Sequence, residues 1–112
     1  MEFKLIITTV KSDLTDNVVE AAKASGAPGA TILSGRGTGI REAKTFLGLT
    51  LEAQTDVVIF LLEEHMVESV FEAIRKAGMF EEPGTGIAFV VPVEKVAGLR
   101  SQIKVIKKYL GE

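Results

Sequence analysis

Apolar residues recur along the chain with two different periods, and these periods predict its elements. Short runs rich in β-branched residues predict four strands, at Lys4 to Val10, Ala30 to Leu33, Val57 to Leu62 and Ile87 to Val93. Two longer stretches repeat apolar residues every three or four positions and predict helices. The first begins near Leu14, capped by Ser12 or Asp13, and ends before Gly26; the second is opened by Glu63 and Glu64 and ends at Gly78.

A third stretch of this kind, residues 99–110, predicts a C-terminal helix with Leu99, Ile103, Ile106 and Leu110 on one face. The element order is therefore β-α-β-β-α-β followed by a helix. This is the order of the ferredoxin-like α+β fold, with an antiparallel sheet and here a long loop between the second and third strands. At 112 residues, the chain is expected to form a single domain.

The predicted sheet has more apolar surface than its two helices can cover. The helices of this fold lie on one face, yet VVIFLL (57–62) and IAFVV (87–91) are apolar on both faces. Such a face left in water would form a large exposed apolar patch. We expect the C-terminal helix, other subunits or both to cover it, and therefore expect an oligomer.

Composition narrows the classes of function. The chain is 46% hydrophobic, has no cysteine and carries a formal net charge of −2, so neither a disulfide framework nor a nucleic-acid partner is expected. The N-terminal stretch lacks the layout of a signal peptide, and no apolar run is long enough to span a membrane. We therefore expect a cytoplasmic protein.

Two glycine-rich segments are the candidate chemistry. Ser34-Gly35-Arg36-Gly37-Thr38-Gly39 follows the second strand, and Gly84-Thr85-Gly86 precedes the fourth. Closely spaced glycines allow backbone N–H groups to form an anion-binding nest, and Arg36 between two glycines can reach a phosphate. The Thr85 hydroxyl is a further candidate contact. Both segments could also be ordinary turns that leave or enter a sheet, but we favour the anion-binding interpretation.

The 16 residues from Ile40 to Thr55 show only weak periodicity, and a loop of this length in a small domain is usually functional or disordered. Its apolar residues either pack locally or against a neighbouring subunit, or they form a segment that docks on a partner. They are Ile40, Phe46, Leu47, Leu49 and Leu51.

With these loops in place, the chain resembles the PII nitrogen-regulatory family and the wider PII-like signalling proteins over residues 3–99. The resemblance rests on the strand order, on 35–39 before a long loop, and on the segment GTGIAFV at 84–90. It makes 36–55 the counterpart of the T-loop and 80–86 the counterpart of the B-loop.

The resemblance implies a regulator, not an enzyme: a homotrimer that binds an adenine nucleotide at subunit interfaces. Its long loop would control a partner protein, either an enzyme or a transporter, and a membrane transporter is one candidate. The implied ligand is ADP, ATP or AMP, with a cyclic dinucleotide also open, because Ile87, Thr38 and Gly39 replace residues common in PII proteins. The implied ligand contacts are Gly35, Arg36, Gly37, Thr38, Gly39, Gly84, Thr85, Gly86 and Ile87; no catalytic or metal residue is implied.

Other interpretations stay open. An acylphosphatase-type enzyme on this fold would use Arg36 to bind its anionic substrate. A trimeric metal-tolerance protein of the CutA type would also share the fold. An RNA-binding sheet would need more aromatic and cationic residues than these strands offer. Glu63, Glu64 and His65 suggest a metal site only weakly, because acids are also common where helices begin.

Overall fold

A computed structural model describes residues 2–36, 45–46, 49–50 and 54–99 of the chain. The remaining residues, among them nearly all of the predicted C-terminal helix, lie outside the described part. The elements run in the order β1 (Phe3–Lys11), η1 (Ser12–Leu14), α1 (Thr15–Ala24), β2 (Thr31–Arg36), β3 (Thr45–Phe46), β4 (Leu49–Thr50), β5 (Gln54–Glu63), η3 (Glu64–Met66), α2 (Val67–Ala77) and β6 (Gly86–Val93).

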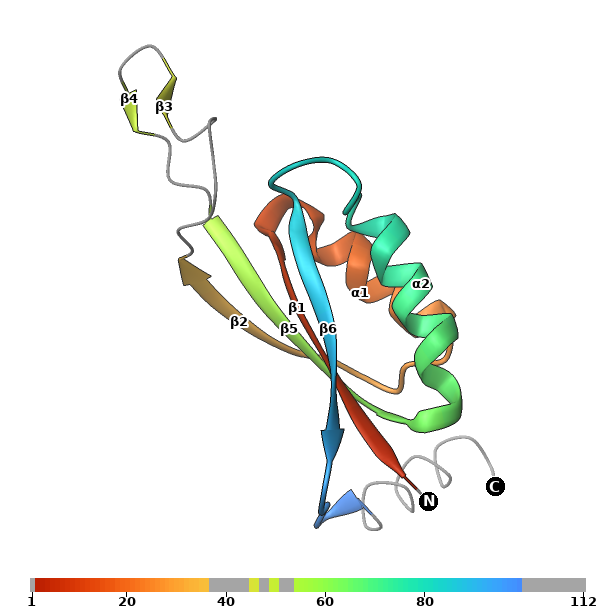
Figure 1. The fold of residues 1–112 in the computed structure, drawn as a ribbon. Helices are drawn as coiled ribbons and strands as arrows, with labels where there is room; N and C mark the ends of the chain where they lie inside the picture. Colours follow the sequence, from red (N-terminus) through yellow and green to blue (C-terminus); the bar gives the residue numbers. More distant parts are fainter. Residues whose placement is uncertain (1, 37–44, 47–48, 51–53, 100–112) are drawn as a thin grey trace.

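Four strands form one antiparallel sheet in the order β2-β5-β1-β6, with α1 and α2 on one face, as Figure 1 shows. This confirms the predicted ferredoxin-like α+β fold. Strands β3 and β4 form a separate two-stranded ribbon within the segment predicted as a long loop, with Thr45 opposite Thr50 and Phe46 opposite Leu49.

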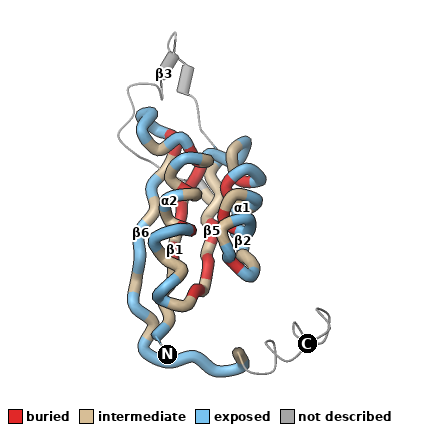
Figure 2. Tube along the Cα trace, turned by 90° about the vertical axis from the view of Figure 1, so that its right-hand side faces the viewer, coloured by how far each residue is buried: buried red, intermediate tan, exposed pale blue. Residues whose placement is uncertain are grey.

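The core lies between the sheet and the two helices, as the buried stretches of β1, β5, α1 and α2 in Figure 2 show. Alternate residues of each central strand point into it, as expected for a half-buried strand. Val18 and Ala22 come from α1, and Val70 and Ile74 from α2, so the buried positions recur at the helical spacing that predicted these two elements. The buried apolar residues are Ile6, Val10, Val18, Ala22, Ala27, Val58, Phe60, Leu62, Val70 and Ile74.

The opposite face of the sheet is apolar, and no described helix covers it. The register places Ile7 beside Ile59 on one side and Phe89 on the other, so their side chains share this face. Phe89 and Leu33 are 44% and 53% exposed, which is high for large apolar side chains. Three threonines, Thr9, Thr31 and Thr55, also lie on this face, and its apolar residues are Phe3, Leu5, Ile7, Leu33, Val57, Ile59, Leu61, Ile87, Phe89, Val91 and Val93.

Several element boundaries differ from the predicted ones because backbone pairing extends past the apolar runs. The second helix does not open at Glu63, which pairs with Phe3 as the last residue of β5. Glu64 continues this pairing, since its N–H donates to the carbonyl of Glu2 at 2.9 Å, and α2 begins only at Val67 after the turn η3. Similarly, η1 precedes α1, and neither helix has a side-chain hydrogen bond at its N-cap.

Candidate functional site

The first glycine segment begins inside the sheet. The predicted strand ended at Leu33, but β2 continues through Gly35 and Arg36. Their backbones pair with Thr55 and Gln54 of β5. Gly35 is thus part of an extended strand and not of a turn. Its strand partner, Thr55, lies just before the apolar run 57–62 of β5. Gly37, Thr38 and Gly39 lie outside the described residues. Arg36 therefore stands at the point where the chain leaves the sheet.

The second glycine segment closes a loop that joins α2 to β6, residues 78–86. At the end of α2 the N–H of Phe80 donates to the carbonyl of Arg75 at 3.2 Å, and that of Met79 to the carbonyl of Lys76 at 3.1 Å. This pair of bonds is the Schellman motif, which needs a left-handed residue after the C-cap. Met79 holds that position with a φ of 55°, a conformation that glycine adopts more readily. Gly84 also has a positive φ, of 80°.

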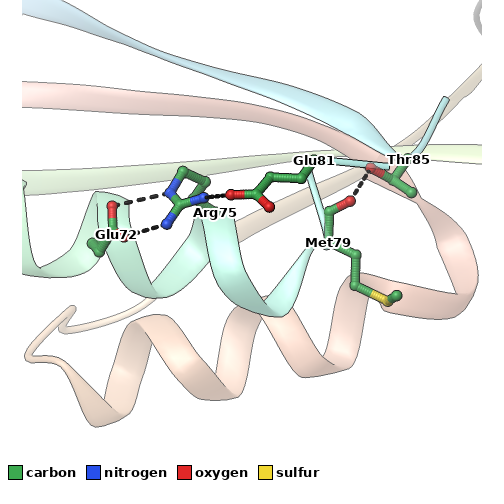
Figure 3. Close-up of polar contacts among 5 residues, drawn as sticks. All are labelled: Glu72, Arg75, Met79, Glu81 and Thr85. Carbon is green, nitrogen blue, oxygen red and sulfur yellow. Dashed lines mark hydrogen bonds and ion pairs between the residues drawn. The ribbon is translucent and has the colours of Figure 1, made fainter. Parts of the chain in front are cut away.

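Thr85 ties this loop together from inside. Its hydroxyl donates to the carbonyl oxygen of Met79 at 2.8 Å (Figure 3). It also donates to the carbonyl oxygen of Glu82 at 3.0 Å, and Thr85 is buried. Its own carbonyl accepts from the N–H of Lys11 at 3.0 Å, which fixes the loop to the end of β1. Since a hydroxyl has a single proton, that proton is used within the loop in this conformation. The structure thus gives Thr85 a structural role within the candidate site.

Gly78 and Gly86 leave room for the ring of Phe80. A Cβ on Gly78 would lie within 3.0 Å of two ring carbons of Phe80. A Cβ on Gly86 would meet the same ring at 3.0 Å and would overlap the carbonyl oxygen of Thr9. Gly86 pairs with Val10 as the first residue of β6, one position earlier than predicted. These two glycines therefore allow the loop to fold down against the end of β1.

Arg75, in the last turn of α2, holds the outside of the loop. Its Nε donates to Oε2 of Glu72 at 3.1 Å and its Nη2 to Oε1 of the same carboxylate, while its Nη1 donates to Oε1 of Glu81 at 2.7 Å (Figure 3). The hydrogen bonds that Arg75 donates to Glu72, and then the one to Glu81, raise the pKa of Arg75 above its ordinary value. The hydrogen bond from Arg75 lowers the pKa of Glu72. Helix and loop are thus joined through one guanidinium.

The two glycine segments lie at the same end of the sheet but on its opposite edges. Ser34 pairs with Asp56, Asp56 with Val10, and Val10 with Gly86, so these four residues form one row across the sheet. Three strand spacings separate the ends of the row, or about 14 Å. The hydroxyl of Thr15 at the start of α1 donates to Oδ2 of Asp56 at 2.6 Å and fixes the middle of the row. The sheet itself thus keeps the two segments of one chain apart.

Ile87 and Lys11 complete the surroundings of the second segment. Ile87 follows Gly86 on the uncovered face and is 61% exposed, so it is available to a ligand or another chain. Lys11, at the end of β1, is exposed next to Thr85. A separate hollow of about 540 Å³ lies at the other end of the sheet, between the α1–β2 connection and the end of β5. It is lined by Phe3, Gly26, Thr31, Leu61, Met66 and Leu99, among others, and contains none of the predicted site residues.

The described residues contain no group of three side chains able to hold a metal ion. His65 instead lies 3.3 Å from Glu63, through its Nδ1 and the Oε2 of the carboxylate, on the exposed surface. None of the helices in the described part is long and apolar enough to cross a membrane.

Sequence reasoning found the glycines but missed the residues that shape the second loop. Phe80 and Arg75 were not predicted to matter, because an aromatic residue and a helix-surface arginine have many ordinary roles. The available signal was the charge pattern: Arg75 stands three residues after Glu72 and six before Glu81, a spacing that allows both contacts.

Comparison with known proteins agrees with this geometry. The model of the family "Nitrogen regulatory protein P-II" matches residues 3–102. The chain is 31% identical over 103 residues to the nitrogen regulatory protein P-II of Azospirillum brasilense, an alignment that covers 88% of this chain and 92% of that protein. The protein of the same name from Mesorhizobium japonicum matches with the same identity and coverage. The chain therefore belongs to the P-II family of nitrogen regulatory proteins.

Proposed function

We propose that this regulator binds an adenine nucleotide between the subunits of a homotrimer and passes its ligand state to a partner through residues 36–55. The observation that carries the proposal is the row Ser34–Asp56–Val10–Gly86, which separates the two glycine segments by about 14 Å within one chain. A nucleotide that contacts both segments then fits best between the β2 edge of one subunit and the β6 edge of another.

The uncovered sheet face supports an oligomer. Eleven apolar residues of the described strands share it, and apolar patches of this extent usually mark a surface that another chain covers. Packing the sheets of three subunits against one another would bury these residues and bring neighbouring edges together. Oligomerisation would thus both complete the core and complete the ligand site.

The ligand would act by favouring one arrangement of the 36–55 segment. Arg36 stands at the end of β2, where the sheet ends, so a phosphate held near Gly35 and Arg36 would contact the root of this segment. A ligand shifts such an equilibrium only by its difference in affinity for the two arrangements. ATP, ADP, AMP and a cyclic dinucleotide would therefore differ in effect through the charge that they place beside Arg36.

Calorimetry with ATP, ADP, AMP and cyclic di-AMP tests this proposal, with the oligomer mass measured by light scattering on the same samples. We expect at least one nucleotide to bind, and Arg36→Ala to weaken its binding by about tenfold or more, as for loss of a hydrogen bond to a charged group. Lys23→Ala removes an exposed cation from α1 and serves as the matched control. The absence of binding at millimolar concentrations of all four nucleotides would refute the proposal.

A further inference from the structure

Arg75 contacts the loop that leads into β6 through Glu81, and no other side-chain contact to Glu81 is found among the described residues. The part of the loop next to β6 is fixed by the hydrogen bonds of the Thr85 hydroxyl and by the bond from the Lys11 N–H to the Thr85 carbonyl. Glu81, at the tip, is 84% exposed, and its described side-chain contact is the one to Arg75. The tip is thus tied to the helix by this contact alone among the side-chain contacts of the described residues.

The guanidinium of Arg75 is oriented before it reaches the loop. Glu72, one turn back on α2, accepts two of its N–H groups side by side, which is the fork geometry in which arginine loses least freedom. The third N–H group, on Nη1, then points to Glu81. A lysine at this position has no planar fork and could not hold both carboxylates in this way.

The contact also changes the charge of the loop. Glu81 and Glu82 are adjacent carboxylates just before Gly84-Thr85-Gly86, and they would repel an anionic ligand at this segment. Arg75 pairs with Glu81 and so offsets one of these two charges. Its effect on the loop therefore has two parts, one of shape and one of charge, and the two can be separated by experiment.

We infer that Arg75 is a positioning residue that holds loop 78–86, through Glu81, in the shape that receives a nucleotide. The inference rests on the proposed function for its ligand, but not for the state of the loop. If the tie is broken, the loop samples other shapes, and the apparent affinity falls by the fraction of time spent in them. For an exposed ion pair this corresponds to about two- to fivefold in affinity.

Hydrogen exchange of the unliganded protein tests the effect on the loop. The reporters are the amides of Glu82 and Lys11, which donate to the carbonyls of Met79 and Thr85. We expect the protection factors of both amides, which account for the changed side chains, to fall in Arg75→Ala and in Glu81→Ala. In Glu82→Ala, where the first reporter is the amide of residue 82, we expect both to keep the wild-type value. Amides of α1 serve as the internal reference in every variant. Unchanged exchange of Glu82 and Lys11 in Arg75→Ala would overturn the inference.

Calorimetry separates shape from charge, with whichever of ATP, ADP, AMP and cyclic di-AMP the wild type binds most tightly. Glu81→Ala and Glu82→Ala each remove one negative charge from the same loop, but only the first removes the tie. We expect Glu81→Ala to weaken binding about two- to fivefold, and Glu82→Ala to leave it unchanged or strengthen it. Arg75→Ala/Glu81→Ala should be no weaker than Arg75→Ala alone, because one contact is lost only once.

Two results are incompatible with the inference: an equal gain in affinity in both glutamate variants, which indicates charge alone, and additive losses in the double variant. Failure of the proposed function gives a different pattern, in which the wild type binds none of the four nucleotides while Arg75→Ala still accelerates exchange at Glu82 and Lys11. The two hypotheses can therefore fail independently.

Discussion

Gly86 and Thr9 approach each other so closely that a Cβ on Gly86 would overlap the carbonyl oxygen of Thr9. That oxygen belongs to the backbone of β1, which is held between β5 and β6, so it cannot move aside as a side chain could. The ring of Phe80 closes the same space from the loop side. The glycine that opens β6 is thus required by backbone packing, whether or not a ligand lies nearby.

Gly86→Ala should lower the free energy of unfolding by about 2–4 kcal/mol, because the clash separates the loop from the end of β1. Urea denaturation monitored by circular dichroism measures the loss. Gly29→Ala is the matched control: a Cβ there meets nothing within 4 Å, so a change within about 0.5 kcal/mol is expected. Equal stability of the two variants would contradict the packing described for Gly86.

Met79→Gly should raise the free energy of unfolding by about 0.5 kcal/mol, since the gain from relieving the positive φ exceeds the added freedom of the unfolded chain. The packing lost is limited to the covered part of the side chain, since Met79 is 44% exposed. Gly26 holds the corresponding position after α1 with a φ of 114°, so Gly26→Ala should instead destabilise. The pair is compared by thermal denaturation, and a loss of stability in Met79→Gly would argue against strain at this position.

Thr8 and Thr15 are both buried threonines, but among the described residues only the Thr15 hydroxyl has a hydrogen-bond partner. The Oγ1 of Thr8 has no hydrogen-bond partner among the described residues, whereas that of Thr15 donates to Asp56. Thr8→Val should therefore raise the free energy of unfolding by about 1 kcal/mol, and Thr15→Val should lower it by about 1–3 kcal/mol. Denaturant titration of both variants checks the two signs, and a destabilised Thr8→Val would indicate a partner for that hydroxyl.

The Arg75–Glu72 contact predicts a dependence on pH. Because Arg75 lowers the pKa of Glu72 in the folded state, the contact stabilises the protein above the ordinary value of 4.5 and loses that effect as the pH falls through the lowered pKa. The stability difference between the wild type and Glu72→Gln should thus shrink on acidification below 4.5. Glu68→Gln, on the same helix, is the control variant. A difference that stays constant over this range would contradict the assignment.

The fold was predictable because the alternating and helical periods are strong in this sequence, and the order βαββαβ follows from them. The ends of the elements were not. Gly35, Arg36 and Glu63 look like loop or helix-start residues, yet each lies in a strand because a neighbouring strand supplies its partner, as Thr55 does for Gly35 and Phe3 for Glu63. Pairing of this kind depends on contacts between distant residues and leaves no local signal.

The candidate site was predictable only as two glycine segments. Their spacing in sequence cannot show that they lie on opposite edges of one sheet, because strand order is a property of the fold. Nor could it show that the Thr85 hydroxyl donates inside the loop, or that Met79 takes the left-handed position next to a glycine. These features arise from the way the loop closes around Phe80.

The most direct test of a site shared between subunits is complementation of two defective variants. Arg36→Ala impairs the first segment, and Gly84→Val impairs the second by placing a β-branched residue at a positive φ. Each variant alone should bind the nucleotide weakly. Native mass spectrometry confirms that the mixed oligomers form. In a 1:1 mixture, each of the two segments at a site comes from the variant in which that segment is unchanged with a probability of one half. About a quarter of the sites should therefore recover wild-type affinity in calorimetry. Subunit exchange without any recovery of binding would show that the two segments of one chain do not complete each other across an interface.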